Sequence, residues 1–274
     1  MLGSGTLVRR VWAGAAKLSR VLEPLRSVTA TRYVAPLREG GSLPGLLEAD
    51  DDGMYVTKFR GAGQGEGALV AEVLAGELGR ALGLPVPELV VVDVPPELGH
   101  AEPDPEIQDL LVASPGPNLG MDFLPGSLPY TPPADPPVDP RLAADIVWFD
   151  TLVTNVDRTH RNPNLLVWHG RIWLIDHGAA FFRQHGERSL PQTAHDSVPM
   201  LAEHALLSLA GPICDADERL ASRALAAVGG AVALVPDAWL GANPASRRGD
   251  LAAFLTARLA APRAFVAEAE RARG

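Results

Sequence analysis

The chain has 274 residues, of which 47% are hydrophobic and 21% charged, proportions typical of a soluble globular protein with an ample core. Its formal net charge of −9 argues against the basic face expected of a protein that binds nucleic acid directly. The single cysteine, Cys214, excludes an internal disulfide and a cysteine-ligated zinc site, and no window approaches the ~18 apolar residues of a membrane span. These features fit a cytoplasmic protein, which we expect here.

Residues 1–29 form the first recognisable segment, with apolar residues at helical spacing and basic residues between them. A secretory signal needs a continuous apolar core, which this segment lacks. The pattern predicts an N-terminal amphipathic leader or docking helix. A basic transit or membrane-surface helix is the alternative.

A strand predicted at residues 33–35 precedes a glycine-rich turn with the sequence R-E-G-G-S-L-P. In this turn Gly40, Gly41 and Ser42 would let backbone N–H groups approach an anion closely. A Gly-Gly-Ser turn alone is weak evidence for such a site. Its weight comes from its place, one hairpin before a strand that carries a lysine.

Lys58 lies on that strand, predicted over residues 54–59, whose alternating pattern presents the lysine on one face. Lys17 and Lys58 are the only lysines among 24 basic residues. Because arginine fills nearly every other cationic position, a lysine on an apolar strand indicates that a compact ammonium is needed there.

A helix is predicted over residues 68–82, because Gly83 and Pro85 then supply a stop signal. It carries two acidic residues. Glu72 lies in the first turn, where the helix dipole by itself favours a carboxylate, and Glu77 is expected to be a surface acid.

A buried strand is predicted over residues 88–94, and residues 95–140, rich in Pro, Asp and Gly, are predicted to be an extended connection. Residues 121–126 within this connection are apolar enough to line a cleft. Asp139-Pro140 then marks a clear helix start. Further helices are predicted over residues 199–210, 215–229, 246–258 and 262–272.

The stretch from Asn155 to Gly178 places Asp157 and two amides in a polar loop, before a predicted two-stranded hairpin. The hairpin strands, residues 165–168 and 172–175, end on a second acid, Asp176. A carboxylate facing a substrate hydroxyl, with an amide and a second carboxylate for magnesium, is the arrangement that phosphoryl transfer needs.

The motifs R-E-G-G-S-L-P, V-T-K-F, A-E-V-L-A-G-E-L-G-R-A-L-G-L-P-V-P, N-x-D-R and L-I-D-H-G resemble those of the HipA-like kinase family, whose catalytic arrangement is shared with phosphoinositide kinases. The resemblance covers about residues 33–180. It implies an α+β, bilobal, protein-kinase-like fold over residues 30–274. The β-rich small lobe would span about 30–120 and the mostly helical large lobe about 130–274.

The resemblance also implies the roles of the acidic residues and the lysine. Asp157 would be the catalytic carboxylate, and Asp176 would bind Mg²⁺. Lys58 would hold the α- and β-phosphates of ATP, and Glu72 would orient Lys58. The remaining nucleotide contacts would come from Gly40, Gly41 and Ser42 at the phosphates and from Asp122, Phe123 and Leu124 at the adenine.

Two amides compete for the second metal position. Asn162 lies five residues after Asp157, as in related kinases, whereas Asn164 directly precedes the Leu-Leu strand. We favour Asn164, because its place beside a strand fixes it more rigidly than a loop position does. Asn162 remains the alternative.

The phosphate acceptor is not identified by the sequence, because the H-R-D triplet and the A-P-E segment of protein kinases are missing. We expect transfer of the γ-phosphate to a hydroxyl of a protein Ser or Thr, a lipid headgroup or a small molecule. The alternatives are a nucleotide-binding pseudokinase and an AMP transferase. Arg158 either neutralises phosphate charge or pairs with a nearby acid, and His177 is expected to pack or hydrogen-bond locally.

Overall fold

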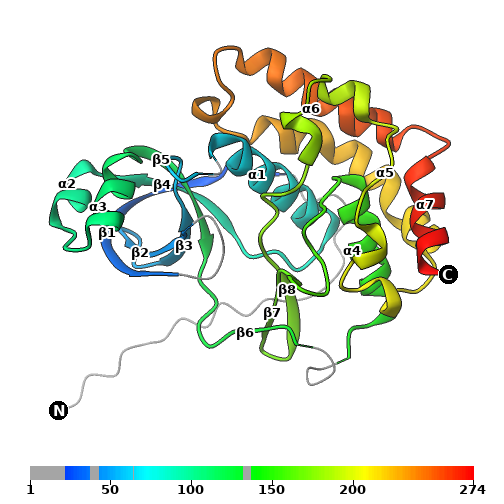
Figure 1. Cartoon of the computed structure of the whole chain (residues 1–274), viewed down its shortest axis with the longest axis horizontal. Coiled ribbons are helices and arrows are strands. Elements are labelled where there is room, and N and C mark those ends of the chain that lie inside the picture. Colours follow the sequence, from blue (N-terminus) through cyan, green and yellow to red (C-terminus); the bar gives the residue numbers. More distant parts are fainter. Residues whose placement is uncertain (1–21, 38–42, 64, 132–136) are drawn as a thin grey trace.

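A computed structural model of the chain describes residues 22–37, 43–63, 65–131 and 137–274, and shows a mixed α+β protein. Five strands close into a barrel in the order β1-β2-β3-β5-β4, with β1 and β4 parallel and the other pairs antiparallel (Figure 1). Their bounds are β1 Arg26–Pro36, β2 Gly45–Ala49, β3 Met54–Lys58, β4 Leu89–Val94 and β5 Gly116–Asp122. The barrel interior is one apolar core, built from side chains such as Val28, Leu47, Phe59 and Val90.

Helix α1 (Gly65–Leu82) lies between the barrel and most of the other helices; α2 (Pro96–Ala101) and α3 (Pro105–Val112) lie against the barrel instead (Figure 1). The α-helices are α1 Gly65–Leu82, α2 Pro96–Ala101, α3 Pro105–Val112, α4 Pro140–Leu152, α5 Ile213–Ala233, α6 Pro244–Leu259 and α7 Ala264–Arg273. Short 3-10 helices are η1 Phe182–His185, η2 Leu190–Thr193, η3 Leu201–Glu203, η4 Leu207–Leu209 and η5 Asp237–Trp239. A second, larger apolar core joins α1 to α4, α5, α6 and α7.

Helix α1 is buried on most of its surface because it lies between the barrel and the other helices. It ends as its sequence predicts, with Gly83 in the left-handed region at φ +84°. Arg223 of α5 donates to the carbonyl of Leu82 at 2.9 Å, and so satisfies a backbone acceptor that the helix end leaves open. The helix that carries Glu72 is therefore anchored to the helical part of the protein.

A small three-stranded sheet, separate from the barrel, carries the predicted hairpin (Figure 1). Strand β6 (Leu128–Pro129) pairs with β7 (Leu165–Trp168), which pairs with β8 (Arg171–Leu174). The predicted two-residue turn is confirmed: His169 and Gly170 both have positive φ, at 50° and 73°. Such paired left-handed residues suit the twist of a tight hairpin.

The prediction of an extended connection over residues 95–140 is wrong, because α2, α3, β5 and β6 all lie within it. The segment carries a helix-start signal: the side chain of Asp104 accepts from the amide of Glu106 at 3.0 Å, and Pro105 follows the cap. The two helices span six and eight residues, which is shorter than the window of roughly 11–18 residues over which apolar periodicity indicates a helix, and this is why the pattern missed them.

The helix predicted over residues 199–210 is also wrong, since the segment forms only the short turns η3 and η4. Its backbone bonds elsewhere: the carbonyl of Glu203 accepts from the amide of His160, and the amide of Ala205 donates to the carbonyl of Arg158. These partners take backbone groups that an α-helix would use internally.

Three further expectations concern burial and the N-terminus. Glu77 is buried and pairs with Arg80 at 3.2 Å, so the prediction of a surface acid is wrong. Residues 26–29, expected in the leader, belong to β1, and residues 1–21 lie outside the described part of the chain. Within the described part, no helix combines the length and apolar character needed to cross a membrane.

Because Leu74 lies on α1 and is fully buried, Leu74→Ala is expected to lower the free energy of unfolding by about 2–5 kcal/mol. The matched control is Leu225→Ala, at a leucine of α5 that is 49% exposed, for which we expect a change within about 0.5 kcal/mol. Urea unfolding followed by circular dichroism measures both. Equal effects of the two substitutions would contradict the packing of α1 described above.

Candidate active site

Three elements bring the predicted lysine and two predicted acids together. Lys58 at the end of β3 forms ion pairs with Glu72 of α1 and with Asp176, which follows β8; its Nζ lies 2.6 Å from Asp176 Oδ1. The side chain of Glu72 is 5% exposed and that of Asp176 is 39% exposed. The ammonium therefore joins a buried carboxylate to one that still faces solvent.

The charges of this cluster depend on one another. Burial alone would lower the pKa of Lys58, but the charges of Glu72 and Asp176 outweigh it, and the pKa is raised. Burial alone would raise the pKa of Asp176, but Lys58 outweighs it, and the pKa is lowered. At neutral pH the cluster therefore contains an ammonium and an ionised Asp176, as a phosphate- and metal-binding site requires.

Glu72 also holds the backbone that follows Asp176. Its Oε2 accepts from the amide of His177 at 2.9 Å, while Oε1 binds Lys58. The ring of His177 is buried, and burial, followed by the charge of Arg158, lowers its pKa to about 3. His177 is thus neutral at physiological pH, and it packs edge-on against Phe149 with ring centroids 6.2 Å apart.

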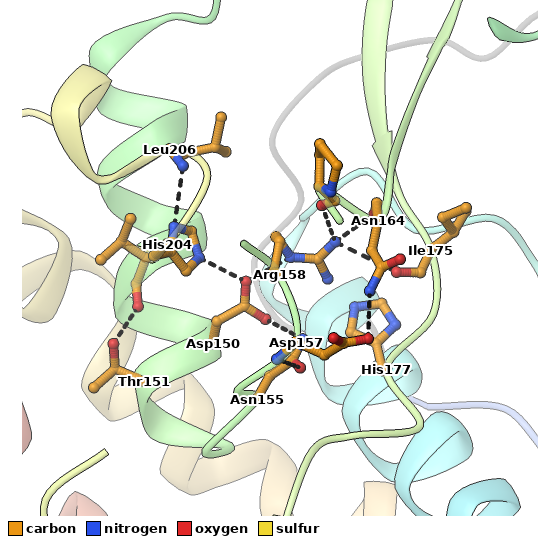
Figure 2. Close-up of polar contacts among 12 residues, drawn as sticks. Asp150, Thr151, Asn155, Asp157, Arg158, Asn164, Ile175, His177, His204 and Leu206 are labelled. Carbon is orange, nitrogen blue, oxygen red and sulfur yellow. Dashed lines mark hydrogen bonds and ion pairs between the residues drawn. The ribbon is translucent and has the colours of Figure 1, made fainter. Parts of the chain in front are cut away.

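Asp157 lies in the loop before β7, within reach of both competing amides. Its Oδ2 accepts from Nδ2 of Asn162 at 2.8 Å and from Nδ2 of Asn164 at 3.3 Å. Figure 2 shows Asn164 beside Asp157. Asn162 is exposed, whereas Asn164 is half-buried and its carbonyl accepts from the amide of Ile175 at 3.1 Å. The backbone of Asn164 is therefore tied directly to the residue that precedes Asp176.

Arg158 lies inside the protein, with a side chain that is 0% exposed. Its Nε lies 2.6 Å from Oδ2 of Asp150 on α4, and Nη1 donates to backbone carbonyls, including those of Asn164 and Ile175 (Figure 2). Of the two roles considered for Arg158, the structure shows the pairing with an acid. The guanidinium supports the loop from within.

The residues that orient Asp150 were not found from the sequence. Asn155 donates to its Oδ1 at 3.0 Å, and Nε2 of His204 lies 3.1 Å from its Oδ2 (Figure 2). Nδ1 of His204 accepts from the amide of Leu206 at 3.1 Å, so the proton is on Nε2 and is donated to Asp150. One signal in the sequence could have indicated this pairing: Asp150 lies near the end of an apolar helix, eight residues before Arg158.

The expected adenine contacts lie where β5 leaves the barrel. The amides of Asp122 and Phe123 donate to carbonyls of Glu88 and Met54, and Leu124 is buried. Nε1 of Trp168 donates to the carbonyl of Pro125 at 3.0 Å, which joins this segment to the β7–β8 hairpin. The expected phosphate contacts Gly40, Gly41 and Ser42 lie outside the described residues.

The side chains of Asp176 and of the two competing amides have the oxygen donors that a magnesium ion prefers. Asp176 would supply a carboxylate, and Asn164 or Asn162 would supply an amide oxygen, since each amide nitrogen is turned to Asp157. The described residues contain no group of three or more His, Cys, Asp or Glu side chains placed to hold a metal. One or two protein oxygens completed by substrate phosphates is the usual way in which proteins bind Mg²⁺.

The pair of Asp150 and Arg158 predicts the acid stability of the protein. Burial alone would raise the pKa of Asp150, but the charge of Arg158 and the hydrogen bond from His204 hold it well below the usual 3.8. As the pH falls, the carboxylate of Asp150 is therefore protonated in the unfolded chain before it is protonated in the folded protein. The stability that the ionised carboxylate contributes is fully present above about pH 4 and is lost as the pH falls below that value.

Asp150→Asn is expected to lower the free energy of unfolding by about 3–5 kcal/mol at pH 7, because Arg158 is left buried without its partner. Below pH 4 the variant should lose less stability per pH unit than the wild type. Urea unfolding between pH 3 and pH 7 measures both effects, with the exposed Asp93→Asn as control. Parallel pH profiles for Asp150→Asn and the wild type would contradict the assignment.

Comparisons with known proteins agree with this geometry. A profile of the HipA-like kinases matches residues 31–260 of the chain. Among solved structures, the chain is similar to the proinflammatory kinase CtkA of Helicobacter pylori, with a TM-score of 0.56 and 13% sequence identity. The match covers 91% of this chain and 98% of that one, and at this identity it shows a shared fold alone. No curated protein has a significantly similar sequence.

The family match spans most of the sequence. It includes the lysine on β3, the glutamate on α1 and the two aspartates that flank the hairpin. The chain therefore belongs to the HipA-like kinase family.

Proposed function

We propose that the protein is an ATP- and Mg²⁺-dependent phosphotransferase that moves the γ-phosphate of ATP to a hydroxyl group. The observation that carries the proposal is the cluster of Lys58, Glu72 and Asp176, with Asp157 on the loop beside it. In the proposed bilobal arrangement, the barrel side forms the small lobe from about residue 30 to 120. The helical side forms the large lobe from about 130 to 274.

The nucleotide would bind between Lys58 and the β7–β8 hairpin. Lys58 would hold the α- and β-phosphates, assisted by Gly40, Gly41 and Ser42, with Glu72 keeping the ammonium in place. The adenine would lie near Asp122, Phe123 and Leu124, where the chain leaves the barrel beside Trp168.

Asp176 and Asn164 would hold Mg²⁺, with Asn162 as the alternative amide. The bound ion would neutralise charge on the phosphoryl group as it is transferred. Phosphate binding would draw Lys58 away from Asp176 and so leave the carboxylate to the cation. Because Glu72 keeps its bond to the amide of His177, the backbone at Asp176 would stay in place during this exchange.

Asp157 would orient the acceptor and take its proton. The hydroxyl oxygen would attack the γ-phosphorus, the bond from that phosphorus to the bridging oxygen of ADP would break, and the hydroxyl proton would pass to the carboxylate. Both amides bind Oδ2 of Asp157, so we assign Oδ1 to the hydroxyl.

A catalytically inactive nucleotide-binding protein is a weaker alternative, because Lys58, Glu72, Asp157 and Asp176 are all present and three of them are in direct contact. Transfer of AMP from the same site would need the nucleotide to bind with its α-phosphorus toward Asp157. The mass of the modified product separates the reactions, since a phosphoryl group and an adenylyl group differ in mass.

Asp157→Ala is expected to reduce phosphate transfer by about 10²- to 10⁴-fold, the range typical of general acid–base groups, while ATP binding is retained. Transfer from ATP labelled at the γ-phosphate to lysate acceptors measures activity, and isothermal titration measures binding. Asp109→Ala, on the exposed face of α3, is the matched control and should leave both unchanged. Transfer by Asp157→Ala at the wild-type rate would refute the assignment.

The two amides are distinguished by a matched pair of substitutions. Asn164→Ala should raise the Mg²⁺ concentration needed for half-maximal transfer by at least about tenfold, because it removes a proposed metal ligand. Asn162→Ala should change it less, because the exposed Asn162 would serve only to orient Asp157. The reverse order of effects would assign the metal to Asn162.

A further inference from the structure

One buried guanidinium contacts the backbone on both sides of the proposed metal site. Nη1 of Arg158 donates to the carbonyl of Asn164, and it lies 3.3 Å from the carbonyl of Ile175. Asn164 is itself the favoured amide ligand, and Ile175 directly precedes Asp176. A single side chain therefore joins the two chain segments that would bring oxygen ligands to the cation (Figure 2).

Both proposed ligand residues have left-handed backbone conformations. Asn164 has φ of 49° and Asp176 has φ of 54°, in a region that is uncommon for residues other than glycine, although Asn and Asp enter it more often than most. Such residues persist only where their surroundings fix them, and they concentrate at functional sites. The bonds from Arg158 to the carbonyls of residues 164 and 175 lie at these two points.

The guanidinium is in turn held from the opposite side. Asp150 binds Nε of Arg158 at 2.6 Å, and Asn155 and His204 fix the Asp150 carboxylate. The segment that carries His204 is joined to the loop, since the amide of Ala205 donates to the carbonyl of Arg158 at 3.0 Å. The orientation of the guanidinium group is thus set by two separate parts of the chain, α4 and the turn at η3.

We propose that Arg158 is a positioning residue for the metal site: it sets the separation of Asn164 and Asp176 through their backbones, and Asp150 and His204 set the direction of the guanidinium. The proposal rests on the proposed function, because it assigns Asn164 and Asp176 to the cation. The guanidinium would act without touching the substrate, since its side chain is 0% exposed.

The test compares two buried arginines that both donate to backbone carbonyls in different parts of the protein; Arg158 also pairs with Asp150. Arg158→Lys keeps the charge, but a single ammonium cannot bind Asp150 and both carbonyls with the geometry of the fork. Arg258 is the matched control: it is also buried and donates to three backbone carbonyls, those of Leu152, Ala194 and Thr151. Arg258→Lys removes the same kind of contact away from the metal site.

The main measurement is nucleotide binding at increasing Mg²⁺, followed by thermal shift, and it needs no catalytic turnover. Arg158→Lys should raise the Mg²⁺ concentration for half-maximal stabilisation by ATP by about 10- to 100-fold, the usual effect of losing a group that orients metal ligands. Arg258→Lys should lower the melting temperature without changing the Mg²⁺ requirement. His204→Gln, which leaves Arg158 and Asp150 in place, should shift the requirement in the same direction by less.

The proposal is overturned if Arg158→Lys and Arg258→Lys need the same Mg²⁺ concentration. If Arg158→Lys fails to fold, the proposal is overturned when His204→Gln needs the same Mg²⁺ concentration as the wild type. Phosphate transfer is measured in parallel. A wild-type protein that binds Mg²⁺-ATP without transfer would refute the proposed function, and the shift in Mg²⁺ requirement would still decide the role of Arg158.

Discussion

The contact on which this site depends is the ion pair of Lys58 with Glu72. A buried charge is stable only when a partner of opposite sign is close, so the end of β3 and the middle of α1 must meet. Asp176 joins the same ammonium from the hairpin. Three elements distant in the sequence thus converge on one ammonium. In the proposed function the same ammonium would bind phosphate, and the carboxylate of Asp176 would bind the cation.

The second constraint is the placement of α1. This helix carries Glu72 toward the barrel, but it belongs to the apolar core of the helical part and is capped there by Arg223. The carboxylate that positions Lys58 is therefore fixed by packing on the side opposite the barrel. Because Glu72 also binds the amide of His177, the same residue ties the lysine to the proposed metal-binding segment.

Buried charged and polar side chains, rather than apolar packing, hold the loop of Asp157 in place on the side that faces the protein interior. Asp150 and Arg158 are both buried: Nε of the arginine binds the Asp150 carboxylate, and Nη1 donates to backbone carbonyls. Hydrogen bonds between a carboxylate and a guanidinium are directional, so they fix the loop in one conformation more specifically than apolar packing does. Residues 201–206, part of the helix predicted over 199–210, form hydrogen bonds to this loop in place of the hydrogen bonds of an α-helix.

The local features could be predicted from the sequence: α1 with its glycine stop, the start of α4 at Asp139, the hairpin turn, and the choice of Lys58, Glu72, Asp157 and Asp176 as candidate site residues. The elements follow from short-range rules of capping and periodicity, and the candidate residues follow from their motifs and from the resemblance of those motifs to the HipA-like kinases. Four features are visible in the folded protein alone: Arg158 pairs with Asp150, His204 contacts the same carboxylate, Glu77 is buried, and Asn164 is hydrogen-bonded to Ile175. Such contacts join residues from separate elements, and their partners are selected by packing and burial, which local sequence patterns do not encode.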